Sequence, residues 1–547
     1  MTGRLETARR PRVSTPGKLS TASRTFGRSR LTRRGLIRAG AASAGALIGF
    51  STLLDYAPTG ARGASSPPRG TITIGFFPDI TSADPQVSNE LPPLYLFVEG
   101  LTSTDATGKV VPFVAQSWTV EDAGRSYTFK LRPNVTFHNG RKLTAEDVQR
   151  SIQRVKDPAT AAFRQADMRL VDAVTAVNAN TVRISLSAPN ASFPALLAGV
   201  FIIAPESIES NGKITRPIGT GPFQFAEWQP GDRLVLRRFP QYWQPGLPKV
   251  DSVIVRMMSD DTARMNGLRS GDLDLMIGVP PQFVPVVKSD PAIHVDTGKS
   301  TIYSHITFNM HAGVPTQLQD VRVRRAIAYA LDKPQLVAAR QSPSGMVDNQ
   351  PYRAGEYWFA DLPDGFSKQN LTQARALLRE AGVGPLTVEV ITLARWERMA
   401  EVMQQQLRPI DIQLKITSIP DFATFQSRLI KYDYGFLSDT GFPRDDPSQV
   451  YAFWASGSPS NIYRGGFQDS QLNQLLVAAS TQPNPLVRRN YYRDALKIIT
   501  DQHVATVIYA GEGEIWAYRS RLVGFQMGRT NRLHYSGGGL AYVSVGG

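Results

Sequence analysis

The chain has 547 residues, of which 42% are apolar and 20% charged, and it contains no cysteine. This length exceeds a single hydrophobic core and indicates roughly two or three domains, and the composition is that of an ordinary soluble globular protein. The lack of cysteine excludes disulfides, thiolate metal ligands, a cysteine nucleophile and a lipid-anchored N-terminal cysteine.

The net charge of +15 is concentrated in the N-terminal head of the chain. Residues 1–64 hold twelve Arg or Lys and two acids, Glu6 and Asp55, and contribute +10 of that charge. Proteins that bind nucleic acids gather their positive charge on a folded face, whereas this Ser/Arg/Gly-rich head cannot form a core. We therefore predict no nucleic-acid partner.

Two adjacent arginines in this head precede an apolar run. Arg33 and Arg34 are followed by the Ala- and Gly-rich run Ala39–Leu54 and by small residues at Ala61–Ala64. The run is shorter than the roughly 20 residues that span a bilayer, so the pattern predicts an export signal. The paired arginines resemble a twin-arginine signal. We predict export by the twin-arginine machinery, cleavage near residues 60–65, and a periplasmic, unanchored mature protein.

The folded body opens with a predicted buried strand at residues 71–77 and a predicted apolar helix at Leu94–Leu101. The alternation of Tyr127, Phe129 and Leu131 predicts a half-buried strand. A helix is predicted to follow Thr144, which is a suitable N-cap because acids occupy the first turn. His138 has no acid or nucleophile beside it in the sequence, and we expect it to pack at a turn.

The stretch from Arg216 to Asp274 alternates turns with short strands. Gly219, Gly221 and Pro222 predict a tight turn before a strand, and Pro230-Gly231-Asp232 predicts a reversal into a second strand. From Tyr303 onward helices and strands alternate, which indicates α/β organisation. The last ~45 residues are predicted to be strands.

Several of these segments resemble, in order, one protein family. They are Arg216–Asp274, the sequence FHNGRKLTAEDV at 137–148, and a segment that contains Asn309, Pro315 and Asp320 ahead of a helix. Over roughly residues 70–545 the chain resembles the extracytoplasmic solute-binding proteins of peptide and nickel ABC importers, solute-binding family 5. The resemblance implies a carrier that is not an enzyme and that needs no cofactor.

The fold implied by the resemblance is α/β, a two-lobed periplasmic-binding-protein fold of type II that is enlarged with an extra domain and has mixed sheets flanked by helices. The expected parts are the head at 1–64, the lobe I core at 65–109 with 206–300 and 505–547, the extra domain at 110–205, and lobe II at 301–504. We expect a monomer whose lobes close over a ligand by hinge motion.

The function implied by the resemblance is that of a periplasmic receptor. It would bind a peptide or peptide-like solute in the inter-lobe cleft and deliver it to an inner-membrane ABC permease with its ATPase subunits. The alternatives are a receptor for another carboxylate-bearing or metal-chelate solute and, in a different class, a secreted hydrolase that uses paired carboxylates. For the hydrolase the candidate pairs are Asp260/Asp261, Asp272/Asp274 and Asp445/Asp446.

The candidate ligand-binding residues lie mainly between Tyr432 and Trp454. In peptide-binding members of the family, an acid three residues before an Asp-Pro pair holds the ligand ammonium, but here that position is Pro443, before Asp446. The acid would then be Asp439 or Asp445, or be missing. Arg444 suits a ligand carboxylate, or it belongs to a solvated loop. The remaining candidates are the apolar side chains Phe442 and Trp454, each of which could instead be core, and Asn89 and Glu90.

Overall fold

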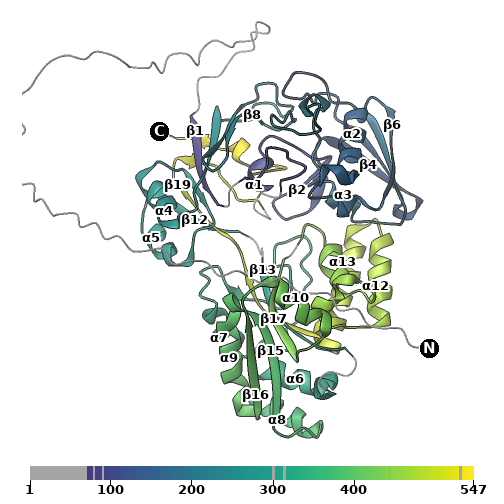
Figure 1. Cartoon of the computed structure of the whole chain (residues 1–547), viewed down its shortest axis with the longest axis vertical. Coiled ribbons are helices and arrows are strands. Elements are labelled where there is room, and N and C mark those ends of the chain that lie inside the picture. Colours follow the sequence, from purple (N-terminus) through teal and green to yellow (C-terminus); the bar gives the residue numbers. More distant parts are fainter. Residues whose placement is uncertain are drawn as a thin grey trace, which may run out of the picture. The chain divides into compact units, whose positions relative to one another are not determined.

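The computed structural model describes residues 70–77, 80–88, 91–298, 302–311, 316–442, 444–528 and 532–546. The chain divides between Ser66 and Pro67 into a head and a body. The predicted signal residues Arg33 and Arg34 lie outside the described residues, as do the predicted ligand-binding residues Asn89 and Glu90. The body is α/β, with mixed sheets flanked by helices in two lobes (Figure 1), and the predicted fold class is confirmed.

Lobe I is built on a mixed sheet with the strand order β12-β19-β11-β1-β10-β9-β8. The central strand β1 runs parallel to β10 and β11, and β10, β9 and β8 form antiparallel pairs. Ile72 and Ile74 of β1 are fully buried. The strands are β1 (Thr71–Phe76), β8 (Phe223–Gln229), β9 (Arg233–Arg238), β10 (Ser252–Met257), β11 (Leu275–Ile277), β12 (Ile293–Thr297) and β19 (Ile515–Arg519), and the helices are α4 (Asp261–Ser270) and α5 (Val284–Lys288).

The extra domain has an antiparallel sheet in the order β4-β5-β7-β6, on which helix α2 packs. Thr144 and Asp147 form a capping box at the start of α2, and this confirms the predicted N-cap. Tyr127 and Phe129 of β5 are fully buried. The elements are β4 (Ala115–Glu121), β5 (Ser126–Leu131), α2 (Ala145–Lys156), β6 (Val171–Asn178), β7 (Thr181–Leu186) and α3 (Phe193–Leu196), preceded by α1 (Leu91–Leu94), β2 (Thr102–Thr104) and β3 (Val110–Pro112).

The predicted helix at Leu94–Leu101 is wrong, because α1 ends at Leu94. The backbone beyond it hydrogen-bonds to a distant segment: the carbonyl oxygen of Phe97 accepts from the amide of Gly221 at 3.2 Å. A Cβ atom on Gly219 would overlap the carbonyl oxygen of Phe97. Tertiary pairing therefore overrides the apolar pattern, and glycine permits the close approach.

His138 fastens the same glycine turn. Its Nδ1 accepts a hydrogen bond from the amide of Gly219 at 3.3 Å, and its Nε2 lies 3.0 Å from the carbonyl oxygen of Gly221. The ring meets that of Phe239 edge-on at 4.9 Å between centroids. Burial lowers the pKa of His138 to about 4, so the ring is neutral near pH 7. The prediction that His138 packs at a turn is confirmed.

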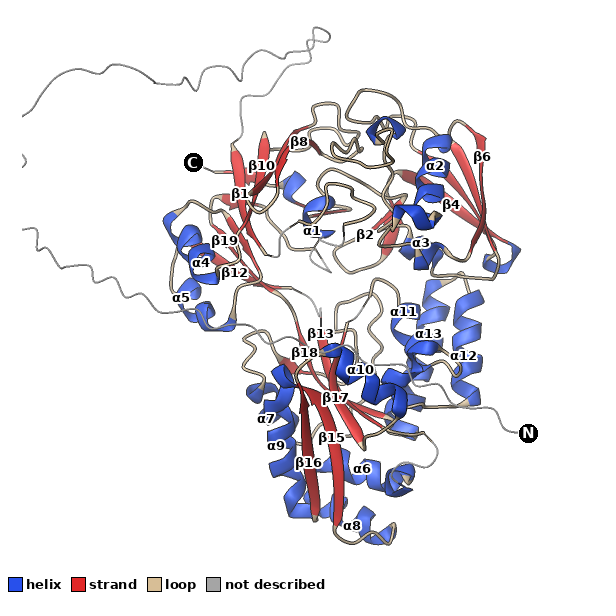
Figure 2. Cartoon of the chain, in the orientation of Figure 1, coloured by secondary structure: helices blue, strands red, loops and turns tan. Residues whose placement is uncertain are grey.

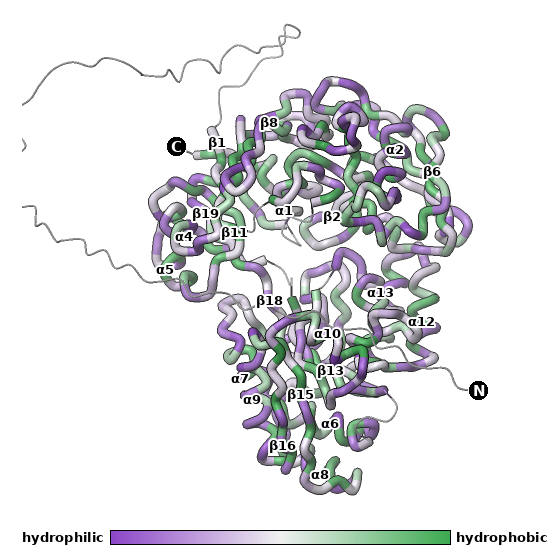
Figure 3. Tube along the Cα trace, viewed as in Figure 1, coloured by the Kyte–Doolittle hydropathy of each residue, from purple (hydrophilic) through white to green (hydrophobic). Residues whose placement is uncertain are grey.

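Lobe II has a second mixed sheet in the order β14-β18-β13-β17-β15-β16. Helices α6–α9 pack on one face and α10–α13 on the other, and Figure 2 shows α9 along β15 and β16. Much of β15 is green, hence hydrophobic, in Figure 3. The strands are β13 (Ile302–Phe308), β14 (Met346–Val347), β15 (Leu386–Leu393), β16 (Ile412–Ile419), β17 (Phe436–Gly441) and β18 (Thr506–Glu512).

The helices of lobe II form two groups, one on each face of the sheet. Those beside the Ile306 face of β13 are α6 (Val321–Ala330), α7 (Lys333–Ala339), α8 (Leu371–Glu380) and α9 (Glu397–Leu407), and those beside the Tyr303 face are α10 (Phe422–Lys431), α11 (Ser448–Tyr451), α12 (Ser470–Thr481) and α13 (Pro485–Lys497). The inner strands β13, β17 and β15 are thus covered by apolar side chains on both faces, whereas the edge strands β14 and β16 keep exposed residues.

The C-terminal stretch contributes to both lobes. Strand β18 joins the lobe II sheet and β19 joins the lobe I sheet. Leu522, Leu533, Leu540 and Val543 belong to the lobe I core. Short antiparallel pairs complete this stretch: β20 (Leu522–Val523) with β23 (Ser544–Val545), and β21 (His534–Tyr535) with β22 (Gly538–Gly539).

Candidate ligand-binding site

The chain crosses between the lobes where glycines touch. Two segments make the crossing. The first leads from the end of β12 at Thr297 in lobe I to the start of β13 at Ile302 in lobe II, and the second leads from β18 back to β19 through Gly513 and Glu514. The amide of Gly298 donates a hydrogen bond to the carbonyl oxygen of Glu514 at 2.8 Å. A Cβ atom on Gly513 would overlap the carbonyl oxygen of Gly298, so this crossing requires glycine.

A cavity of about 630 Å³ lies beside these crossings, and both lobes line it. Its volume falls within the range of about 300–1,000 Å³ that is typical of small-molecule sites. It combines apolar walls with hydroxyl, carboxylate and guanidinium groups. The lining residues are Gly278, Val279, Pro281 and Ile515 from lobe I, Ile302, Ser342, Pro343, Ser344, Phe442, Arg444 and Glu512 from lobe II, and Gly513 and Glu514 at the crossing.

The loop after β17, whose described residues Phe442 and Arg444–Asp446 we call the cavity loop, is held by lobe II side chains. The hydroxyl of Tyr352 donates to the carbonyl oxygen of Arg444 at 3.1 Å, and Nε1 of Trp358 donates to that of Asp445 at 2.9 Å. The phenyl ring of Phe442 is 54% exposed and lines the cavity. The backbone carbonyl groups of Arg444 and Asp445 are therefore held in place, while the side chains of Phe442 and Arg444 line the cavity.

The acids in the cavity already have partners. Glu512 forms an ion pair with Arg340, whose side chain is 3% exposed and whose guanidinium lies 4.0 Å from the ring centroid of Trp396. Burial lowers the pKa of Arg340. Glu514 accepts a hydrogen bond from Nε1 of Trp516 at 2.8 Å. The charge of Glu512 is thus balanced by a buried cation, whereas the uncharged indole of Trp516 leaves the Glu514 carboxylate negative. The lining therefore carries one further carboxylate and one guanidinium, those of Glu514 and Arg444.

Asp439 does not line this cavity. It lies on β17 opposite His305 of β13, on the sheet face that Leu437 shares with helix α10. Burial raises the pKa of the Asp439 carboxyl, and the charge of Arg464 opposes this shift. Among the described residues, Asp439 forms no ion pair within 4 Å. The side chain of Asp439 is half-buried, and a cation that arrived with a ligand would favour its ionised form.

Asp445 and Trp454 also lie away from the cavity. Asp445 forms an ion pair with Arg532, a residue of the C-terminal stretch. Trp454 is 5% exposed and packs edge-on against Phe467 with 5.7 Å between ring centroids, inside the lobe II core. Of the predicted residues that the structure describes, it brings Phe442 and Arg444 together at the cavity and leaves the other three on surrounding elements.

Sequence reasoning missed Glu512, Glu514, Ser342 and Ser344 of this cavity. The hydroxyl of Ser344 donates to the carbonyl oxygen of Gly513 at 2.6 Å, which ties the loop after α7 to the crossing. Gly511-Glu512-Gly513 carried a usable signal, because a glycine on each side of an acid at a strand end indicates a close backbone approach. Nothing in the sequence marked the serines.

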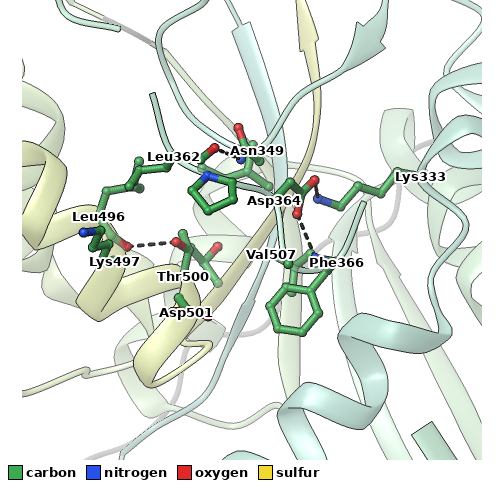
Figure 4. Close-up of a pocket in the computed structure, with 14 residues that line it drawn as sticks. Lys333, Asn349, Leu362, Asp364, Phe366, Leu496, Lys497, Thr500, Asp501 and Val507 are labelled. Atoms are coloured by element: carbon green, nitrogen blue, oxygen red, sulfur yellow. Dashed lines mark hydrogen bonds and ion pairs between the residues drawn. The ribbon is translucent and has the colours of Figure 1, made fainter. Parts of the chain in front are cut away.

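A second cavity, of about 140 Å³, lies within lobe II (Figure 4). Nζ of Lys333 is 2.6 Å from the carboxylate of Asp364, and the Lys333 side chain is 2% exposed. Burial lowers the pKa of Lys333, and the Asp364 charge opposes this shift. The same carboxylate accepts from the amide of Phe366 at 3.0 Å. The charges of this small cavity are thus matched within the protein, and it lacks a contribution from lobe I.

No group of three or more His, Cys, Asp or Glu side chains that could hold a metal ion occurs in the described part of the chain. Within the same residues, none of the helices combines the length and the apolar character needed to cross a bilayer.

A sequence profile of the bacterial extracellular solute-binding proteins, family 5 (middle region), matches residues 109–462 of the chain. The chain belongs to this family. The matched residues include the extra domain, the turn at Gly219–Pro222 and the cavity loop. Membership makes the protein an extracytoplasmic solute-binding protein.

Individual family 5 proteins are similar to the chain over most of its length. The glutathione-binding protein GsiB of Escherichia coli O1:K1 is 25% identical over 461 residues, which is 78% of this chain and 86% of the relative. HbpA2 of Haemophilus parasuis superposes with a TM-score of 0.78 at 23% identity, covering 87% of this chain and 100% of that one. DppA of Helicobacter pylori, in complex with the peptide STSA, gives 0.65 at 22% identity, covering 87% and 98%.

Proposed function

We propose that the chain is the periplasmic substrate-binding receptor of an ABC importer and that it binds a peptide or peptide-like solute in the cavity beside the lobe crossings. The observation that carries the proposal is the lining of this cavity by both lobes around Gly513. Binding in such a place couples the ligand to hinge motion, and an inner-membrane permease with its ATPase subunits would receive the solute. In this role the chain acts as a monomer.

A peptide-like ligand suits the chemistry of the cavity. Phe442 and Ile302 offer apolar surface, Arg444 offers a guanidinium for bidentate contact with a carboxylate, and the serine hydroxyls offer further hydrogen bonds. Two of the relatives point the same way, since one is named for glutathione and another holds a peptide. We assign Arg444 to the ligand carboxylate and Asp439, which lies on β17 outside the cavity lining, to the ammonium group of a ligand that extends beyond the cavity along β17.

We also propose that the protein has no catalytic activity. Each acid pair that the hydrolase alternative would use is engaged in a local contact: Asp446 pairs with Arg488, Asp274 with Arg521 and Asp261 with Arg264. A glycosidase needs two free acids that face each other across a substrate. The ligand should therefore be recovered from the protein unchanged.

The experiment combines ligand discovery with one variant. Native mass spectrometry of the protein purified from its own periplasm should find a bound solute, and a panel of di- and tripeptides, glutathione and their N-acetyl and amide derivatives should raise its melting temperature. Arg444→Gln should lower the affinity for carboxylate-bearing ligands by about tenfold, or 1.4 kcal/mol. If no member of the panel raises the melting temperature, the ligand assignment fails.

Arg183→Gln is the matched control for the Arg444 variant. Arg183 pairs with Glu121 on the extra domain, and both side chains are exposed. This variant removes the same charge without touching the cavity, and its affinities should equal those of the wild type. An equal loss in both variants would show that net charge, and not Arg444, governs binding.

Export is the remaining part of the proposal. We assign Arg33 and Arg34 to a twin-arginine signal that is cleaved near residues 60–65. Replacing both arginines with lysine should leave the precursor in the cytoplasm, which fractionation and N-terminal sequencing of the mature protein would reveal. Normal export of the double variant would exclude this route.

A further inference from the structure

The adjacent acids that end the cavity loop bind arginines from different lobes. Asp446 accepts two hydrogen bonds from Arg488 of α13, at 2.6 and 2.9 Å, within lobe II. Asp445 instead accepts from Arg532, which comes from the C-terminal stretch of lobe I. Asp446 therefore forms an ion pair inside lobe II, whereas its neighbour Asp445 forms one between the lobes.

Arg532 is anchored firmly in lobe I. The next residue, Leu533, is fully buried in the lobe I core, and its carbonyl oxygen accepts from the amide of Leu540 at 2.7 Å. The guanidinium lies 4.7 Å from the ring centroid of Tyr95, also in lobe I. Its side chain is 4% exposed, and that of Asp445 is 16% exposed. The ion pair is therefore nearly dry and spans the lobes.

A dry ion pair between two bodies behaves differently from one inside a single core. Separating the lobes gives Arg532 and Asp445 access to water, whereas bringing them together removes that water and places the two charges in contact. If Asp445 loses its charge, approach of the lobes buries the Arg532 guanidinium without this anion. The pair thus favours the approach of the lobes only while both partners are present.

The contacts within lobe II leave the cavity loop folded without Arg532. Tyr352 and Trp358 hold its backbone, and Arg488 holds Asp446. Arg532 adds a contact from the opposite lobe, one residue from Arg444. Other contacts between the lobes are the hydrogen bonds from the amide of Tyr357 to the carbonyl oxygen of Thr107 at 3.0 Å and from Nη1 of Arg488 to the carbonyl oxygen of Ala191 at 3.4 Å, and neither joins two charged side chains.

We propose that Arg532 is a positioning residue for ligand binding, which holds the cavity loop of lobe II against lobe I through Asp445 and so retains the ligand. This inference rests on the proposed binding of a solute between the lobes. Because the pair forms when the lobes meet, it slows ligand release and leaves the first encounter unchanged.

The cysteine-free chain allows a direct test, since any introduced cysteine is unique. Spin labels at Lys288→Cys on α5 and Glu401→Cys on α9, both exposed positions in different lobes, report the distribution of distances between the lobes without a ligand. Arg532→Gln and Asp445→Asn should each shift this distribution to larger separations. The reversed pair, Asp445→Arg with Arg532→Asp, should restore it.

Ligand kinetics form the second arm, with a peptide from the binding panel as probe. Both single variants should raise the dissociation rate on the order of tenfold and leave the association rate within about a factor of two. Arg521→Gln is the matched control, because Arg521 belongs to the same C-terminal stretch and pairs with a buried acid, Asp274, inside lobe I. It should change neither the distances nor the dissociation rate.

The two arms separate failure of this inference from failure of the proposed function. If wild-type distances persist in both single variants, or the reversed pair restores nothing, the role of Arg532 is overturned even when peptides bind. If the distances respond but the wild type binds no peptide, Arg532 still links the lobes while the proposed ligand class falls.

Discussion

The turn Gly219–Pro222 in lobe I and the cavity loop in lobe II use polar contacts in opposite ways. At the turn, His138 and the backbone of Phe97 satisfy neighbouring groups within one lobe. In the cavity loop, successive residues contact the cavity, lobe I and the lobe II core. Substitutions at the turn should therefore change stability alone, whereas those around the loop should separate stability from affinity.

Asp446→Asn is the strongest test of this comparison. Asp446 belongs to the cavity loop, but its ion pair with Arg488 contributes to stability rather than to the cavity. The variant leaves Arg488 buried without its anion, since the two side chains are 2% and 4% exposed. We expect the free energy of unfolding, from urea denaturation, to fall by about 3–5 kcal/mol. Arg183→Gln, which breaks an exposed pair, should cost at most about 1 kcal/mol. Equal losses would contradict the assignment of Asp446 to the scaffold.

His138 gives the turn a characteristic response to pH. The pKa of His138 is about 4 in the folded protein and 6.5 ordinarily. Between pH 4 and pH 6.5 the imidazole is therefore protonated in the unfolded chain and neutral in the native protein. Stability is therefore retained above pH 6.5 and lost as the pH falls toward 4. The loss attributable to His138 should be roughly 2 kcal/mol at pH 5.

The measurement is the free energy of unfolding from pH 4.5 to 7.5 for the wild type and for His138→Gln. The variant removes the titrating group, and its curve should be flatter across this range, while its ligand affinity at pH 7 stays equal to that of the wild type. A variant curve as steep as that of the wild type would assign the pH response to other groups.

The sequence alone was sufficient for most of the scaffold, because its signals are local. The alternation of Tyr127 and Phe129 and the capping box at Thr144 act over a few residues. The helix predicted at Leu94–Leu101 failed because its backbone hydrogen-bonds to Gly221, which lies far away along the chain. Local pattern cannot reveal a partner of that kind.

The candidate site was harder to predict for the same reason. Phe442 and Arg444 could be proposed because they precede the Asp-Pro pair that the family resemblance marks, and both line the cavity. The partner of Asp445 lies 87 residues away in the chain, and the serines at 342 and 344 are ordinary in sequence. Which carboxylate remains available to a ligand is decided by ion pairs that only the folded chain reveals.

Substitution of Asp439 tests whether this acid near the cavity loop binds a ligand and lowers the stability of the ligand-free protein. Burial raises its pKa in the folded protein, so the ionised carboxylate is disfavoured there, and stability falls as the pH rises from the ordinary pKa of Asp through the raised one. Asp439→Asn should accordingly melt at a higher temperature than the wild type at pH 7, and the difference should vanish at low pH.

The same substitution should lower the affinity for an amine-bearing peptide by at least about tenfold, or 1.4 kcal/mol, and leave the affinity for its N-acetyl derivative unchanged. Wild-type affinity for the amine should drop as the pH falls through the raised pKa, because a protonated carboxyl cannot pair with ammonium. Thr440→Ser, at the next position of β17, is the control. A variant that gains stability while keeping full affinity would place the ammonium elsewhere, and one that loses stability would show that Asp439 belongs to the scaffold, as Asp446 does.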